Sequence, residues 1–172
     1  MAGDATGVGV EEVGGIPRPQ DSQLDILGTT WSSDGKYLNL VMHLESVTGD
    51  PTGSTGRDYR FYFTHKDTRW AVGAQLPSAP MDTAFIQGPI MYNDTDGEYG
   101  ECGGCKITFD DKKNTFSLRV AYDTFDRAFP GSEKVGSGTK FTNLTSVTAR
   151  FQVALIMPVD NSDAPEGAVF TF

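Results

Sequence analysis

The chain contains few of the residues that metalloenzymes and hydrolases use, with two histidines and two cysteines in all. A structural zinc site takes about four ligands, and Cys102 and Cys105 have no second pair to complete one. No Gly-x-Ser-x-Gly motif accompanies His43 or His65, so the pattern of a Ser-His-Asp hydrolase is lacking. We therefore expect that the protein is not an enzyme.

Basic charge and long hydrophobic runs are also lacking. The chain has 14 lysines and arginines against 23 aspartates and glutamates, and this formal net charge of -9 repels a phosphate backbone. No apolar run approaches the ~20 residues of a membrane-spanning helix. These absences predict no nucleic-acid partner and no membrane insertion. The acidic composition is typical of calcium binding or of simple solubility.

No signal peptide is visible where the chain starts, at Met1-Ala2-Gly3-Asp4. This start is typical of an initiator methionine placed on an excised domain, from which a signal peptide has been removed. We infer an extracellular or cell-surface location from the type of domain, and not from an address in the sequence.

Turn residues and alternating apolar residues dominate what is present. Glycine (20) and proline (9) are plentiful, and the apolar residues Leu38, Leu40, Met42 and Leu44 fall on one face of an extended segment. This period of two marks a half-buried β-strand. Strand signals recur over Leu24–Trp31, Lys36–Glu45, Asp58–Thr64, Arg69–Gln75, Ala84–Tyr92, Lys106–Phe109, Thr115–Ala121, Val147–Ile156 and Val169–Phe172. The segment between Asn93 and Gly104 is expected to be a loop.

This pattern predicts an all-β fold, namely an antiparallel β-sandwich of jelly-roll kind with about nine strands. The one helical candidate is a short turn over Asp123–Phe129, which Asp123 can cap and which Pro130-Gly131 would end. The Gly- and Pro-rich residues 1–23 are expected to form an extended N-terminal arm. Residues 24–172 are expected to form a single β-sandwich domain.

The two cysteines are spaced as Cys-Gly-Gly-Cys, at Cys102 and Cys105, which resembles a redox motif. No βαβ pattern surrounds the motif, and this disfavours a redox role. We expect a small disulfide, which closes a very short loop and so stabilises less than a long-range bridge would. A reduced pair in a cytosolic protein is the alternative.

The order of short motifs along the chain resembles a known group of domains. The motifs are Gly3-Asp4-Ala5-Thr6, Leu24-Asp25-Ile26, Ser33-Asp34-Gly35, Tyr59–Phe63, Phe116–Asp123, and Asp163-Ala164-Pro165-Glu166-Gly167 with Phe170. The order resembles accessory β-sandwich domains of secreted bacterial proteins, as in the C-terminal extensions of subtilisin-like proteases. It is distantly similar to family-nine carbohydrate-binding modules and DOMON-like domains. The resemblance implies a non-catalytic domain, with structural calcium near the termini of several members.

Aspartates near the two termini are the candidate calcium ligands, because calcium takes roughly six to eight oxygen ligands from loops. Asp4, Asp25 and Asp163 are far apart in the sequence, but the termini of a jelly roll commonly lie on adjacent strands. The oxygen-rich run Asn93–Glu98 is a second candidate, although it departs from the EF-hand spacing. The alternative is that these aspartates only stabilise turns.

Surface aromatic residues are the candidate ligand-binding groups, because a sugar ring stacks on an aromatic face while polar side chains bond its hydroxyls. The candidates are Trp31, Tyr62, Trp70 and Tyr92. The alternative is that aromatic residues in strands belong to the core or to cross-strand pairs. Haem binding by a methionine and a histidine, as in DOMON-like relatives, is disfavoured because the neighbouring Met42 and His43 point to opposite faces of one strand.

These observations together predict a non-catalytic, calcium-stabilised accessory or binding module of a secreted or cell-surface bacterial protein. The expected ion is Ca2+ in a structural role. The expected partner is a polysaccharide or a protein domain of the same parent chain. The alternative function is a carbohydrate-binding module proper, which uses surface aromatics.

Overall fold

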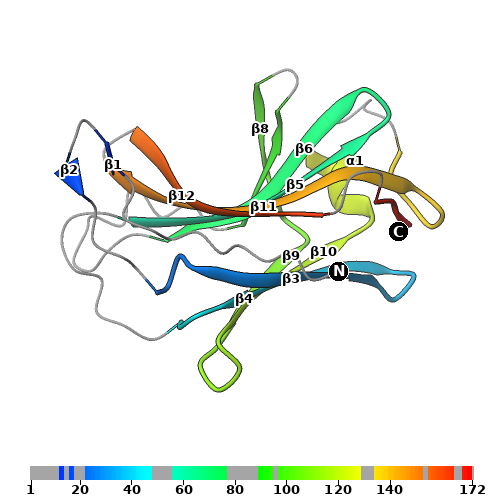
Figure 1. The fold of residues 1–172 in the computed structure, drawn as a ribbon. Helices are drawn as coiled ribbons and strands as arrows, with labels where there is room; N and C mark the ends of the chain where they lie inside the picture. Colours follow the sequence, from blue (N-terminus) through cyan, green and yellow to red (C-terminus); the bar gives the residue numbers. More distant parts are fainter. Residues whose placement is uncertain are drawn as a thin grey trace.

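Two antiparallel β-sheets face each other in the computed structural model, and this confirms the predicted all-β sandwich (Figure 1). The structure describes residues 12–13, 16–17, 22–47, 56–76, 89–94, 97–128, 134–152, 155–164 and 168–171. Within these ranges the one helix is α1 (Asp123–Ala128), where a short helical turn was predicted. No helix in the described ranges is long and apolar enough to cross a membrane.

The smaller sheet has four strands in the order β3 (Ile26–Ser33), β4 (Tyr37–Leu44), β10 (Thr115–Ala121) and β9 (Cys105–Asp110). Gly35, at a φ of 78°, lies in the turn that joins β3 to β4. The predicted alternation of β4 is confirmed, since its buried residues alternate with partly exposed ones. The sheet therefore has one face in the core and the other toward solvent.

The larger sheet has the order β12 (Leu155–Asp163), β11 (Lys140–Gln152), β5 (Gly56–His65), β6 (Thr68–Leu76), β7 (Pro89–Asn93) and β8 (Glu98–Glu101). A further strand, β13 (Phe170–Thr171), pairs with the start of β11. The twist of this sheet is visible in Figure 1, where β8 stands nearly upright while β11 and β12 run across the view. Within the predicted N-terminal arm, β1 (Glu12–Val13) pairs with β2 (Ile16–Pro17).

Aromatic side chains fill the space between the two sheets. Trp31 of β3 packs edge-on against Phe61 and Phe63 of β5, with ring centroids 5.6 and 6.0 Å apart. Phe116 of β10 stacks on Tyr59, with 4.8 Å between the centroids. Burial of each large apolar side chain contributes about 1.5–3 kcal/mol. These rings come from both sheets, so their contacts hold the two layers together.

The C-terminal strands differ from the prediction of one strand over Val147–Ile156. That segment contains the end of β11 at Gln152 and the start of β12 at Leu155, which are antiparallel partners. β12 is an edge strand, where a proline such as Pro158 is tolerated. Its C-terminal half is polar at every position from Asp160 on, so apolar and polar residues do not alternate there. The loop expected between Asn93 and Gly104 likewise contains β8.

The chain passes from the larger to the smaller sheet at the Cys-Gly-Gly-Cys motif. The Cα atoms of Cys102 and Cys105 lie 5.3 Å apart with the sulfurs at bonding distance, as expected for the predicted disulfide. A Cβ on Gly104 would collide with the side chains of Thr124 and Arg127, so α1 packs closely against this corner. A larger residue at position 104 would therefore require these two side chains to move.

Candidate functional site

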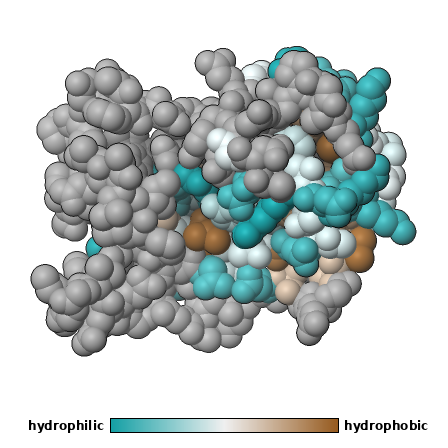
Figure 2. Space-filling view, turned by 90° about the horizontal axis from the view of Figure 1, so that it is seen from above, coloured by the Kyte–Doolittle hydropathy of each residue, from teal (hydrophilic) through white to brown (hydrophobic). Residues whose placement is uncertain are grey.

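Charged side chains lie on the outer face of β5. Alternate residues from Tyr59 to Phe63 are buried in the core, so the two-residue period of the strand turns Asp58, Arg60 and Tyr62 to the opposite side. Figure 2 shows this side of the molecule, where hydrophilic side chains surround small hydrophobic patches among the described residues. Among the described residues, the outer face of β5 is therefore polar, in contrast to its inner face.

Asp58 and Arg60 form a two-point ion pair although both are buried. Arg60 Nη2 lies 2.7 Å from Asp58 Oδ2, and Arg60 Nε donates to Asp58 Oδ1 at 3.0 Å. Only 1% of the Asp58 surface and 7% of the Arg60 surface is exposed. Burial by itself lowers the pKa of Arg60, but the adjacent carboxylate outweighs it and raises that pKa above its ordinary value. The guanidinium is therefore always charged and is held in one place.

Gly73 of β6 makes room for this ion pair. It lies directly opposite Arg60 in the antiparallel ladder. A Cβ at this position would lie 3.0 Å from Arg60 Cα and 3.1 Å from Arg60 Cγ, and still closer to the carbonyl oxygen of Tyr59. The missing side chain lets the stem of Arg60 lie along the sheet.

Tyr62 and its neighbours extend the charged group along the outer face. The guanidinium carbon of Arg69 lies 4.8 Å from the ring centre of Tyr62, and Arg69 Nε lies 3.4 Å from Asp94 Oδ2. Burial raises the pKa of the Tyr62 hydroxyl; Arg60 opposes the rise, and the carboxylates of Asp58 and Asp94 add to it. We name these five residues, Asp58, Arg60, Tyr62, Arg69 and Asp94, the β5–β6 cluster.

The outer members of the β5–β6 cluster are accessible to solvent. The side chain of Arg69 is 51% exposed and that of Asp94 is 29% exposed. A guanidinium only donates hydrogen bonds and an ionised carboxylate only accepts them. The accessible pair can therefore bind adjacent hydroxyl groups of one ligand, while the buried Asp58–Arg60 pair keeps β5 in a fixed geometry.

The four aromatic residues predicted to bind ligand have different environments. Trp31 is 7% exposed and Trp70 is 2% exposed, so both indoles belong to the core and offer no face to a sugar. We expected these two tryptophans to stack on a sugar ring, but they pack inside the core. Tyr62 belongs to the β5–β6 cluster. Tyr92 occupies the same register row, since Ala71 lies opposite both tyrosines, but its side chain is outside the described part of the chain.

Two of the three predicted calcium ligands lie in the described part of the chain. Asp4 lies outside the described residues, and Asp25 is partly buried just before β3. Asp163 is exposed at the end of β12, where its Oδ2 accepts a hydrogen bond from Asn161 Nδ2 at 3.0 Å. In the second oxygen-rich run, Asp94 pairs with an arginine. No three carboxylate, imidazole or thiol groups converge on a metal position within the described ranges, and the calcium site stays a prediction.

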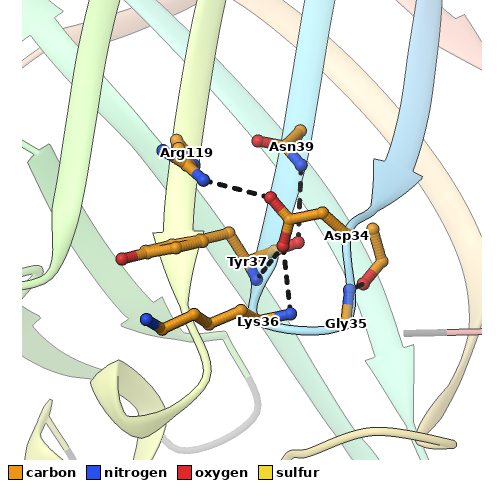
Figure 3. A network of polar contacts seen from close by, with 7 residues as sticks. Asp34, Gly35, Lys36, Tyr37, Asn39 and Arg119 are labelled. Atoms are coloured by element: carbon orange, nitrogen blue, oxygen red, sulfur yellow. Dashed lines mark hydrogen bonds and ion pairs between the residues drawn. The ribbon is translucent and has the colours of Figure 1, made fainter.

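A second polar network lies at the outer face of the smaller sheet (Figure 3). Asp34 Oδ1 accepts hydrogen bonds from the backbone N–H groups of Lys36 at 3.0 Å and Tyr37 at 2.8 Å. Asp34 Oδ2 accepts one from Arg119 Nη2 at 3.0 Å, and the guanidinium carbon of Arg119 lies 3.7 Å from the Tyr37 ring centre. The Tyr37 amide first, and then Lys36 and Arg119, hold the pKa of Asp34 below its ordinary value. We name these four residues the Asp34 network.

The sequence contains one signal for the β5–β6 cluster, which lies in the charge pattern of β5 and not in a motif. Asp58 and Arg60 are opposite charges two positions apart in a predicted strand, and such residues share a face. Arg69 and Asp94 come from different strands or loops, so only the folded arrangement of β6 and β7 brings them together.

Neither a protein-family model nor a curated protein matches the chain. The resemblance to accessory β-sandwich domains rests on its short motifs, and the family of the chain stays a prediction. The function has to be inferred from the β5–β6 cluster and the Asp34 network.

Proposed function

We propose that the protein is a non-catalytic binding module of a secreted or cell-surface protein and that the β5–β6 cluster is its binding surface. The main support is the buried Asp58–Arg60 pair, which Tyr62 links to the accessible Arg69 and Asp94. Burial of two charges has a desolvation cost that their mutual attraction often fails to offset. A binding role that requires a fixed strand and a fixed guanidinium gives a reason for such a pair.

A polysaccharide is the ligand class that the β5–β6 cluster fits best. Sugar hydroxyls both donate and accept hydrogen bonds, and Arg69 and Asp94 supply the matching donors and acceptors. Tyr62 supplies an aromatic ring, and Tyr92 lies in the same register row on the far side of Ala71. A protein domain of the same parent chain is the second candidate, because arginine and tyrosine also dominate protein interfaces.

We further propose that the module is calcium-stabilised, with Asp4, Asp25 and Asp163 as ligands, as the resemblance implies. Carboxylates near the two termini would fasten the chain ends to the sandwich through one ion. Calcium is then expected to change the stability of the protein and not its choice of ligand.

Retention on insoluble polysaccharides tests the binding function. The full chain is incubated with cellulose, chitin and xylan, and the bound fraction is measured as a function of polymer concentration. Tyr62→Ala and Arg69→Ala should each weaken retention about tenfold or more, as expected for central contacts of an interface. Arg127→Ala is the matched control, since Arg127 forms an exposed ion pair with Asp123 on α1, at 3.1 Å.

Thermal melts of the same variants separate a loss of folding from a loss of binding. Weaker retention by a variant that melts at the wild-type temperature supports the proposed surface. Equal retention of Tyr62→Ala, Arg69→Ala and Arg127→Ala would show that the β5–β6 cluster does not contact the polysaccharide. If the wild type is retained on none of the three polymers, these polysaccharides are excluded as ligands of the β5–β6 cluster, which favours a protein partner at that surface.

A further inference from the structure

The smaller sheet carries charge of the opposite sign to the chain as a whole. Its four strands and their two hairpin turns contain five basic residues and three acidic ones, namely Lys36, Lys106, Lys112, Lys113 and Arg119 against Asp34, Asp110 and Asp111. The whole chain has 14 basic and 23 acidic residues. A net positive sheet in an acidic protein provides a surface that can attract an anionic ligand at short range.

One row of polar residues crosses this sheet from edge to edge. The strand register places Lys106 opposite Arg119, Arg119 opposite Asn39, and Asn39 opposite Ser32. Directly opposite residues of antiparallel strands share a face, and all but the half-buried Asn39 are exposed. The next row on the same face adds hydroxyl groups, from Thr30, Thr108 and Ser117. Cations and hydroxyl groups therefore lie side by side on an exposed sheet.

The Asp34 network fixes the central cation of this row. Asp34 holds one terminal nitrogen of Arg119, and the guanidinium lies against the ring of Tyr37 (Figure 3). A guanidinium has about five N–H donors, so others remain for a second acceptor after Asp34 has taken its bond. Because its position is already fixed, Arg119 has little side-chain freedom to lose when an anion binds beside it.

We propose that this face of the smaller sheet binds acidic polysaccharides, with uronate carboxylates at Lys106 and Arg119 and sugar hydroxyls at the flanking Ser, Thr and Asn side chains. It is a second surface and does not depend on the β5–β6 cluster. Charge complementarity selects this ligand, because a neutral glycan would leave the two cations unused. The net charge of -9 disfavours the much denser charge of a nucleic acid. Repulsion from the acidic remainder of the chain is screened beyond about 8 Å at physiological salt.

Affinity electrophoresis of the full chain in gels that contain polygalacturonate tests this proposal, with neutral dextran as the reference polymer. Lys106→Glu should weaken binding to polygalacturonate about tenfold, because it turns an attractive contact into a repulsive one of similar size. Lys134→Glu makes the same charge change at an exposed lysine outside the smaller sheet, and it should leave binding unchanged. Arg119→Lys keeps the charge but loses the planar contact with Tyr37, and should give about a threefold loss.

Retardation by polygalacturonate that weakens with added salt and with Lys106→Glu, but not with Lys134→Glu, supports the proposal. Equal effects of the two lysine variants, or no retardation of the wild type, would overturn it. Sedimentation of the protein without ligand tests whether a second copy of the chain occupies this face. A dimer that Lys106→Glu dissociates would assign the face to self-association and would also overturn the proposal. Retention on neutral polymers that requires Tyr62 is a separate readout, so the two surfaces can fail independently.

Discussion

Gly73 offers the sharpest test of how the β5–β6 cluster is built into the sheet. In Gly73→Ala the new Cβ would lie 3.0 Å from Arg60 Cα and inside van der Waals contact with the carbonyl oxygen of Tyr59. Both are backbone atoms of the adjacent strand, so the clash cannot be relieved by rotating a side chain. The substitution must push β5 away from β6, or move Arg60 out of its ion pair.

The expected loss of stability follows from these two responses. Overpacking a close-packed site costs about 1–3 kcal/mol. Disruption of a buried ion pair, which leaves a charge without its partner, costs about 3–5 kcal/mol. We therefore expect Gly73→Ala to lower the free energy of unfolding by about 3 kcal/mol or more. The whole free energy of unfolding of a natural domain is only about 5–15 kcal/mol, so this loss is a large fraction of it.

Urea unfolding followed by tryptophan fluorescence measures this loss, because Trp31 and Trp70 are both buried in the core. Gly103→Ala and Gly136→Ala are the controls. No atom lies within 4 Å of a Cβ built at either position, so neither change should lower stability, and each can add up to about 1 kcal/mol through the unfolded chain. If Gly73→Ala unfolds at the same urea concentration as these controls, the described approach of β5 to β6 is refuted.

Three further predictions concern charge and metal. Asp58→Ala should lower the free energy of unfolding by about 3–5 kcal/mol, because it leaves the buried Arg60 charge without a partner. The double replacement of Asp58 by Ala and Arg60 by Met should lower it less, since no buried charge remains; a larger loss in the double variant contradicts this reasoning. The folded pKa of Asp34 lies below its ordinary 3.8, so its contribution is complete above that pH and is lost as the pH falls through the lowered pKa. The difference in melting temperature between wild type and Asp34→Asn should accordingly be constant above pH 3.8 and shrink below it. A difference that grows on acidification would contradict a lowered pKa of Asp34. Calcium at a hundredfold excess over its dissociation constant should stabilise the protein by about 2.7 kcal/mol, and an unchanged melting midpoint with calcium and with EDTA would dismiss the structural ion.

The half-buried strands could be predicted from the sequence because each has one apolar and one polar face. The limits of β10 agree with the predicted Thr115–Ala121, and those of β4 differ by one residue at each end. The edge strand β12 could not be found in this way, since its polar end at Asn161 and Asp163 shows no alternation. The sequence pattern therefore predicts one continuous strand where β11 and β12 form a hairpin.

The candidate site was less predictable than the fold, for a physical reason. Alternation indicates that Arg60 lies on the outer face of β5, and an outward arginine is normally solvated. Its burial, and the space that Gly73 provides for it, depend on how β5 and β6 are paired. Likewise, the core positions of Trp31 and Trp70 depend on which face of each strand meets the opposite sheet.

The cysteine pair lies at the corner where the backbone leaves one layer for the other. A ring closed by so few residues removes little conformational entropy from the unfolded coil, so its contribution to stability is small. Such bonds persist in oxidising compartments and are rare in the cytosol. Resistance of Cys102 and Cys105 to alkylation until a reductant is added would show that the pair is oxidised, which is compatible with residence in such a compartment whatever ligand the molecule binds.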